Sequence, residues 1–148
     1  MANKFNLDKV IRNMRGLNIS LDLANTAKNE FLGNFRNQGF NGQRWQEVKR
    51  RSNPSKSKPR TQAILQGKGS GKLRKDVANS VQSGRRNSNL SYTLVVENEY
   101  ARVHNEGLKA GRGKGFTMPK RQFIGNTQRL NDKLLKKIQQ KTRHIWAV

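Results

Sequence analysis

The stretch SLDLANTAKNEFLGNFRN, from Ser20 to Asn37, decides the fold because it predicts a long amphipathic helix. Its apolar residues recur with the 3.6-residue period of an α-helix. They form one stripe of Leu23, Ala24, Ala27, Phe31, Leu32 and Phe35. Polar residues occupy the remaining faces, and Gly39 is expected to end the helix. One side of this helix must therefore pack against another part of the protein.

Helices are also expected near the two ends of the sequence. A short one lies at about Leu7 to Met14 and is separated from the first by Gly16. A long one is capped by Asn126 or Thr127 and runs to about His144. Its apolar stripe consists of Leu130, Leu134, Ile138 and Ile145. Like the central stripe, it needs a partner surface.

The middle of the chain favours strands. A short helix that begins near Leu73 is expected to give way to a strand at about Ala78 to Ser83. From Leu90 to Glu97, large apolar or aromatic residues occupy every second position, which is the period of a half-buried strand. Residues 83–89 are rich in turn formers. The two strands are therefore predicted to pair as a hairpin.

A helical insert follows these strands. Asn98 can cap a short helix that carries Tyr100 and His104 and ends at Gly107. Residues 116–124 favour another strand, at a sheet edge because of Pro119. The sequence thus predicts a single α+β domain over residues 1–148. It has N-terminal helices, a small, mainly antiparallel β-meander with a short helical insert, a long C-terminal helix, and flexible basic loops at about 49–63 and 108–116.

The composition is strongly basic, with 31 Lys and Arg against 9 Asp and Glu, a formal charge of +22. Residues 43–89 hold 13 basic and 2 acidic side chains, residues 109–148 hold 11 and 1, and residues 90–108 hold 1 and 3. This distribution calls for anionic partners: nucleic acid, acidic protein surfaces or anionic membranes. Leu, Ile, Val and Phe make up only 33 of the 148 residues, a thin apolar supply.

Several function classes fit the sequence poorly. No cysteine is present, which excludes disulfides, zinc ribbons and thiol catalysis. No signal peptide or membrane-length apolar run is recognisable, so a soluble protein made in the cytoplasm is expected. The glycine-rich run at 67–72 departs from a phosphate-binding loop, because Leu73 follows the Gly-Lys pair. No metal or cofactor site is expected.

Two groups of residues allow a catalytic interpretation, but a structural one explains each more simply. Asp76, Glu97 and Glu99 could serve a metal-dependent nuclease, but solvated charges near a strand end explain them more simply. His104 could act as a base, yet a lone histidine beside an aromatic residue is more often a packed structural group. Trp45 is expected to anchor the core rather than stack on a nucleic-acid base.

Free lysines and arginines on loops favour an interface or non-specific DNA contact. The candidate residues are Lys49, Arg50, Arg51, Lys56, Lys58, Arg60, Lys109, Arg112 and Lys114. A basic, largely non-specific nucleic-acid-binding protein is therefore one hypothesis for the function. Its binding would weaken steeply as salt is added.

The order of several short motifs resembles the phage virion-morphogenesis, or tail-completion, family. The most specific motifs are Tyr-Ala-x-x-His-x-x-Gly at 100–107 and Arg-x-Phe-Ile-Gly at 121–125, and the similarity covers about residues 31–138. The residues that carry it, expected to be structural, are Trp45, Leu73, Tyr100, His104, Gly107, Pro119, Arg121, Phe123 and Gly125.

The resemblance implies a structural virion protein without catalytic activity. It implies a tail-completion or head-to-tail joining subunit that forms a homo-oligomeric ring in the phage neck, between head connector and tail tube. The implied partners are further copies of the chain, connector and tail-tube or terminator proteins, and the genomic DNA, with no membrane. Assembly in the host cytoplasm and residence in the virion are expected.

Overall fold

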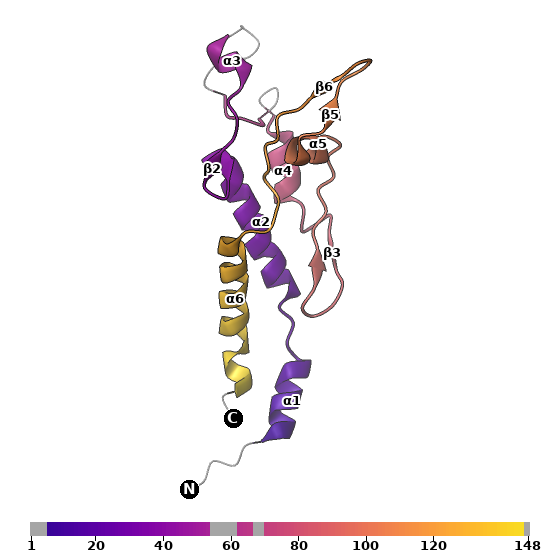
Figure 1. Ribbon diagram of the computed structural model, residues 1–148. Coiled ribbons are helices and arrows are strands. Elements are labelled where there is room, and N and C mark those ends of the chain that lie inside the picture. The colour runs from indigo at the N-terminus through magenta and orange to yellow at the C-terminus, as the bar shows by residue number, and fades with distance from the viewer. Residues whose placement is uncertain (1–5, 54–61, 67–69, 147–148) are drawn as a thin grey trace.

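A computed structural model describes residues 6–53, 62–66 and 70–146 as an elongated α+β molecule (Figure 1). The helices are α1 (Leu7–Arg15), α2 (Ser20–Asn37), α3 (Lys49–Ser52), α4 (Lys72–Ala78), α5 (Ala101–Glu106) and α6 (Gln128–Trp146). The strands are β1 (Gly39–Phe40), β2 (Gln43–Arg44), β3 (Arg85–Arg86), β4 (Tyr92–Thr93), β5 (Lys109–Ala110) and β6 (Phe116–Thr117). The predicted fold class is confirmed.

Helix α2 is the central element and contacts α4, α6, β1 and β4. It spans the predicted residues, but its end differs in detail. Gln38, in the left-handed conformation, terminates the helix, and its N–H bonds back to Asn34 and Phe35. Gly39 instead begins β1, where a Cβ would collide with the carbonyl oxygen of Gln43. Glycine is therefore needed there for close strand pairing rather than as the helix stop.

The strands are shorter and less continuous than predicted. They form three separate antiparallel pairs, β1–β2, β3–β4 and β5–β6. Residues 79–84 are turns, not a strand, and within residues 90–97 only Tyr92 and Thr93 pair, with Arg86 and Arg85. Leu94 and Val96 do pack against the core while Val95 is exposed, so the alternation reports one-sided burial. Among the described residues no strand pairs with Leu94 or Val96, and the N–H of Val95 donates to the carbonyl of Ser80 in the turn after α4.

The hairpin after Gly107 refines two further predictions. Within the predicted flexible basic loop at about 108–116, Lys109–Ala110 pair with Phe116–Thr117, and residues 111–115 connect them. The strand expected over residues 116–124 is therefore limited to its first two residues. After Thr117 the backbone N–H groups no longer bond to a partner strand. Those of Arg121, Phe123 and Ile124 donate instead to the carbonyl of His104 and the side chain of Asn105.

The core lies where α2, α4 and residues 121–125 meet. Its buried members come from several elements and are Ala27, Phe31, Phe35, Trp45, Ile64, Leu73, Val77, Phe123 and Leu130. The ring of Phe35 lies 5.7 Å from that of Trp45, edge to face, and 5.0 Å from that of Phe123. Phe123 has no exposed surface. Aromatic packing around Phe35 therefore joins α2 and the residue after β2 to the distant segment 121–125.

Residues 121–125, the central segment, are held by side chains from other elements. Asn105 of α5 accepts hydrogen bonds from the N–H groups of Phe123 and Ile124, both at 2.9 Å. The indole N–H of Trp45 donates to the carbonyl of Gln122 at 2.7 Å, and Asn34 of α2 donates to that of Phe123 at 3.0 Å. These contacts satisfy backbone groups that burial would otherwise leave unpaired.

The segment enters the core past Gly107, the residue that ends α5. Gly107 has a φ of +73°, and a Cβ added to it would lie 2.9 Å from the Cβ of Lys120 and 3.1 Å from its Cα and N. The following hydrogen bond, from the N–H of Arg121 to the carbonyl of His104, measures 2.8 Å. Glycine therefore supplies both the helix end and the space for the passing backbone.

Replacing Asn105 should destabilise the fold strongly. Asn105→Ala leaves the N–H groups of Phe123 and Ile124 without an acceptor, and we expect a loss of roughly 2 to 4 kcal/mol in the free energy of unfolding. Asn105→Asp keeps an acceptor oxygen and should lose less. Urea unfolding followed by circular dichroism measures both variants. Equal losses for Ala and Asp would contradict this role of the side-chain oxygen.

Replacing Gly107 should cost more than replacing another glycine of positive φ. Gly113 has a φ of +63° and nothing within 4 Å of an added Cβ, so Gly113→Ala carries only the left-handed backbone cost of about 1 to 2 kcal/mol. Gly107→Ala adds the displacement of Lys120, worth roughly 1 to 3 kcal/mol more. Thermal unfolding of the two variants side by side tests the difference, and similar melting temperatures would refute it.

Candidate assembly interface

The residues expected to be structural lie mostly inside the molecule. Trp45, Leu73 and Arg121 are each 7% exposed, and Phe123 is completely buried. A Cβ on Gly125 would collide with the side chain of Gln122 and lie 2.9 Å from Phe40 Cζ. Pro119 is half-buried, between the β5–β6 hairpin and the central segment. These positions surround the core rather than a cleft, which suits a scaffold.

The buried Arg121 and the half-buried His104 are polar neighbours, joined by the hydrogen bond from the N–H of Arg121 to the carbonyl of His104. The guanidinium of Arg121 donates from Nε to the carbonyl of Gln46 at 3.1 Å. Burial lowers the pKa of Arg121, nearby Arg50 lowers it further and Glu47 opposes the change, but an arginine keeps its charge. Burial, followed by the charge of Arg121, lowers the pKa of His104. The imidazole is therefore neutral at pH 7, as in a packed structural histidine.

Tyr100, expected to be structural, lies on the surface. The residue is 58% exposed and directly precedes α5, and its backbone N–H donates to the side chain of Asn98 at 2.9 Å. The turn leaves the ring on the outside, where a hydrogen bond and the charge of Glu99 raise the pKa of the phenol. Asn98 thus supports the start of the helix, but through Tyr100 rather than as its capping residue.

Two of the candidate basic residues have internal roles. Arg50 donates to the carbonyls of Gln62 and Ala63 at 2.8 and 2.7 Å. Arg51 pairs with Glu47 at 2.8 Å and donates to Gln38 at 3.1 Å. These guanidinium groups hold the segment after β2 to the body, so they are poor candidates for contacts with a partner. Lys56, Lys58 and Arg60 lie outside the described residues.

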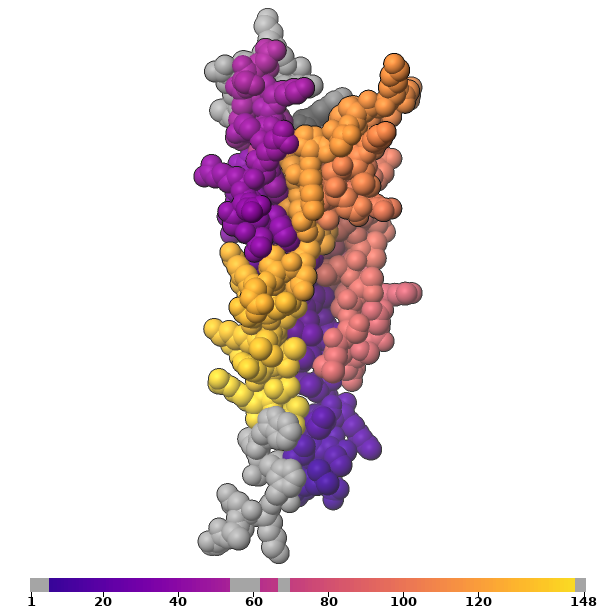
Figure 2. All heavy atoms as spheres, viewed as in Figure 1, coloured from indigo at the N-terminus to yellow at the C-terminus, as the bar shows by residue number. Residues whose placement is uncertain are grey.

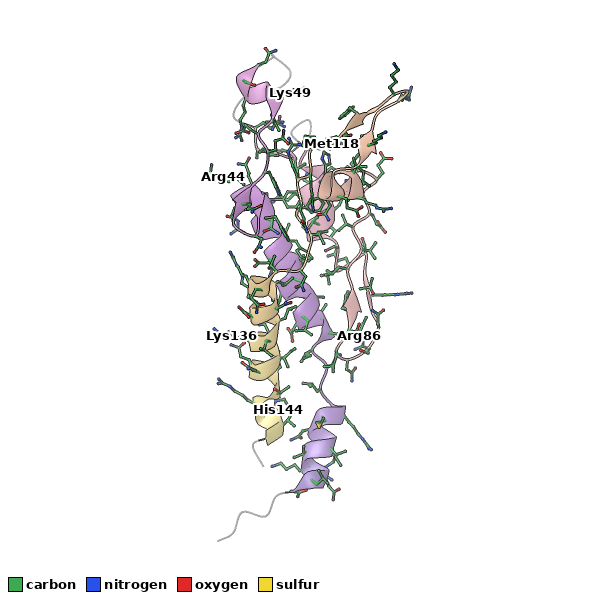
Figure 3. All side chains as sticks on the ribbon, viewed as in Figure 1. Arg44, Lys49, Arg86, Met118, Lys136 and His144 are labelled. Atoms are coloured by element: carbon green, nitrogen blue, oxygen red, sulfur yellow. The ribbon has the colours of Figure 1, made fainter. Side chains whose placement is uncertain are left out.

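The exposed cations spread over several elements. Figure 3 labels Lys49 on α3, Arg86 on β3 and Lys136 on α6, which lie at separate places on the molecule. Lys109, Arg112 and Lys114 belong to the β5–β6 hairpin (residues 109–117), which we call the hairpin arm. The arm extends away from the body in Figure 2. Its three cations are exposed and form no ion pair among the described residues, and neighbouring Phe116 is 57% exposed.

The three acidic residues that could serve a nuclease differ in their contacts. Asp76 accepts hydrogen bonds from Asn98 at 2.7 Å and from Lys72 at 3.0 Å, and these contacts, Asn98 foremost, lower the pKa of its carboxyl group. Glu97 and Glu99 are exposed. Across residues 6–53, 62–66 and 70–146, no three carboxylate or imidazole groups come together as metal ligands would. Of the glycine-rich run, Gly71 precedes α4, while residues 67–69 lie outside the described part.

Several large apolar side chains remain exposed near the two ends of the molecule. Leu7 and Met14 of α1 are 58% and 54% exposed, and Leu90, between β3 and β4, is 60% exposed. Tyr100, directly before α5, and Phe116, in β6, are also exposed, and these two elements lie toward the other end of the molecule (Figure 1). In the described part of the chain, no helix combines the length and apolar character needed to cross a membrane. Met14 and Leu90 line one groove, and neighbouring exposed apolar groups of this kind often mark interaction surfaces.

The sequence agrees with a known family model over residues 4–142, described as the phage virion morphogenesis family. The match exceeds the region of resemblance noted from the motifs and takes in α1, α2, the central segment and most of α6. Searches of curated proteins and of solved structures each gave no match. The chain therefore belongs to the phage virion morphogenesis family, whose members are structural and assembly proteins of the phage particle.

Proposed function

We propose that the protein is a tail-completion or head-to-tail joining subunit of a tailed phage, and that it forms a homo-oligomeric ring in the neck, between head connector and tail tube. The family match over residues 4–142 is the observation that carries this proposal. A structural subunit needs a stable frame and surfaces left open for its neighbours. The protein has both a stable frame and open surfaces.

The frame is a pair of helices fastened by ion pairs. Glu30 of α2, with a side chain only 10% exposed, pairs with Arg129 at 3.1 Å and with Lys133. Asp22 pairs with Lys141 at 3.0 Å, further along the same two helices. Leu130 is buried between these contacts. The α2–α6 pair can therefore keep its shape while other surfaces bind partners.

The open surfaces are the exposed apolar side chains near each end and the hairpin arm. A ring of identical subunits repeats one contact between two different surfaces until it closes. Apolar groups at separate places on the molecule suit such a contact. The arm, with three free cations, suits an acidic surface of the connector or tail tube, or the DNA that passes through the neck.

Oligomerisation tests the proposal directly. We expect the purified protein, alone or mixed with connector and tail-tube proteins of its phage, to form a closed ring of defined mass. Native mass spectrometry gives the number of subunits, and negative-stain images show the ring. Monomers under all of these conditions would contradict the proposed function.

The hairpin arm favours the second candidate function, non-specific DNA binding. If Lys109, Arg112 and Lys114 each neutralise one phosphate, replacing all three by Ala should reduce the slope of log affinity against log salt by about 2.7. Fluorescence anisotropy with duplex DNA at several salt concentrations measures the slope.

A matched control removes three cations from α6, at Lys136, Lys137 and Arg143. An equal change for both triple variants would mean that the arm has no special role in DNA binding. Absent or salt-independent binding by the unmodified protein would remove the nucleic-acid hypothesis altogether.

A further inference from the structure

Helix α1 leaves one apolar face uncovered. Leu7, Ile11 and Met14 stand at i, i+4 and i+7, on one side of the helix, and are 58%, 37% and 54% exposed. We call these residues the α1 stripe. Val10 is the one buried residue of α1, and α1 packs on α6. An amphipathic helix of this kind gains stability when a partner covers its stripe.

A groove continues the α1 stripe onto the body. Met14 lines it together with Leu17, Leu90 and Ile145, so it lies between α1, the β3–β4 turn and the last turn of α6. The connection between α1 and α2 is fixed there, because the N–H groups of Ile19 and Ser20 both donate to the carbonyl of Asn89, at 3.0 and 2.9 Å. The α1 stripe and the groove thus form one continuous, largely apolar surface, and hydrogen bonds fix the backbone beside it.

The charge around this surface selects its partner. Arg15 stands next to the stripe on the helix and lines the groove with Met14, whereas Arg12 and Lys9 lie on other faces of α1. All three cations are exposed and form no ion pair among the described residues, and with Asp8 as its single acidic residue α1 carries three basic groups against one acidic group. A symmetric contact between two α1 stripes would bring the two Arg15 side chains and two helices of net positive charge together, which is unfavourable. The fitting partner is an apolar surface with acidic groups at its rim.

Exposed apolar and acidic residues occur together at another place in the chain. Val95 and Tyr100 are 37% and 58% exposed, and the exposed carboxylates Glu97 and Glu99 lie next to them in sequence. We call these four residues the acidic edge. They belong to residues 90–108, where acidic side chains outnumber basic ones by 3 to 1. The edge leads into α5, whereas α1 lies at the opposite end of the molecule (Figure 1).

We propose that the acidic edge of one subunit docks on the α1 stripe and groove of the next copy. This inference rests on the proposed ring and names the contact that would build it. Tyr100 is the aromatic anchor that enters the apolar surface, while Glu97 and Glu99 face the arginines of α1. Because donor and acceptor surfaces differ, every subunit uses both, and the contact can close into a ring.

Cysteine cross-linking tests the contact, since the chain has no cysteine of its own. Met14→Cys with Tyr100→Cys, and Ile11→Cys with Val95→Cys, place a thiol on each surface. After treatment of the full-length protein with a short bismaleimide, denaturing electrophoresis should show a ladder that ends at the ring size. Each single-cysteine variant should give no more than dimers.

Two control pairs have matched exposure. Met14→Cys with Phe116→Cys moves the second thiol to the hairpin arm, and Leu135→Cys with Tyr100→Cys moves the first to α6, where Leu135 is 54% exposed. We expect no ladder from either. A ladder from a control pair but not from the proposed pairs would overturn the contact while leaving the ring intact.

Charge reversal gives an independent readout by native mass spectrometry. Arg12→Glu with Arg15→Glu, or Glu97→Lys with Glu99→Lys, should weaken the oligomer at least tenfold, and the combined variant should restore part of the loss. Rings that stay unchanged in both reversed variants would overturn this contact but not the proposed ring.

Monomers for the unmodified protein, with no ladder from any cysteine pair, would overturn the proposed function as well. Cross-links made only to an added connector or tail protein would assign the surface to that partner and refute the contact between copies.

Discussion

The need to satisfy the buried backbone of residues 121–125 organises the structure. A strand inside a sheet would meet its partners in neighbouring strands, but this segment has none. Trp45, Asn34 and Asn105 supply the donors and acceptors instead, and all but Asn105 lie more than 70 residues before the segment in the sequence. Because each bond has a directional requirement, the packing around Phe123 depends on the positions of α2, the end of β2 and α5 together.

How much of this could be predicted depended on how local the signal was. The bounds of α2 follow from its apolar period, and Thr127 accepts a bond from the N–H of Leu130 just as a capping residue should. The β1–β2 hairpin is not among the predicted elements, although Asn41-Gly42 is a strong turn signal and both residues have a positive φ. Asn34 and Asn105 gave no comparable signal, because their partners lie 89 and 18 residues away in the chain.

The roles of the basic residues were likewise hard to predict, because they depend on contacts between residues far apart in the sequence. The sequence counts 31 basic residues but cannot tell which of them a fold uses internally. Arg50 and Arg51 belong to a basic run, yet both bind groups of their own chain. On α6, Arg129, Lys133 and Lys141 neutralise acids of α2. The cations that remain for partners are therefore fewer than the total of +22 indicates, and they spread over several elements, the hairpin arm among them.

The small number of apolar residues and the exposure of several large ones can be explained together. Many of the chain's large apolar residues are gathered around Phe35 and Phe123, while Leu7, Met14 and Leu90 remain exposed near one end and Tyr100 and Phe116 toward the other. Burying them within one molecule would require α1 and the hairpin arm to fold back on the body, whereas a neighbour can cover them without any such movement. An extended subunit with a small, strongly connected core is therefore better suited to assembly than to solitary existence, which is consistent with its membership of a virion morphogenesis family.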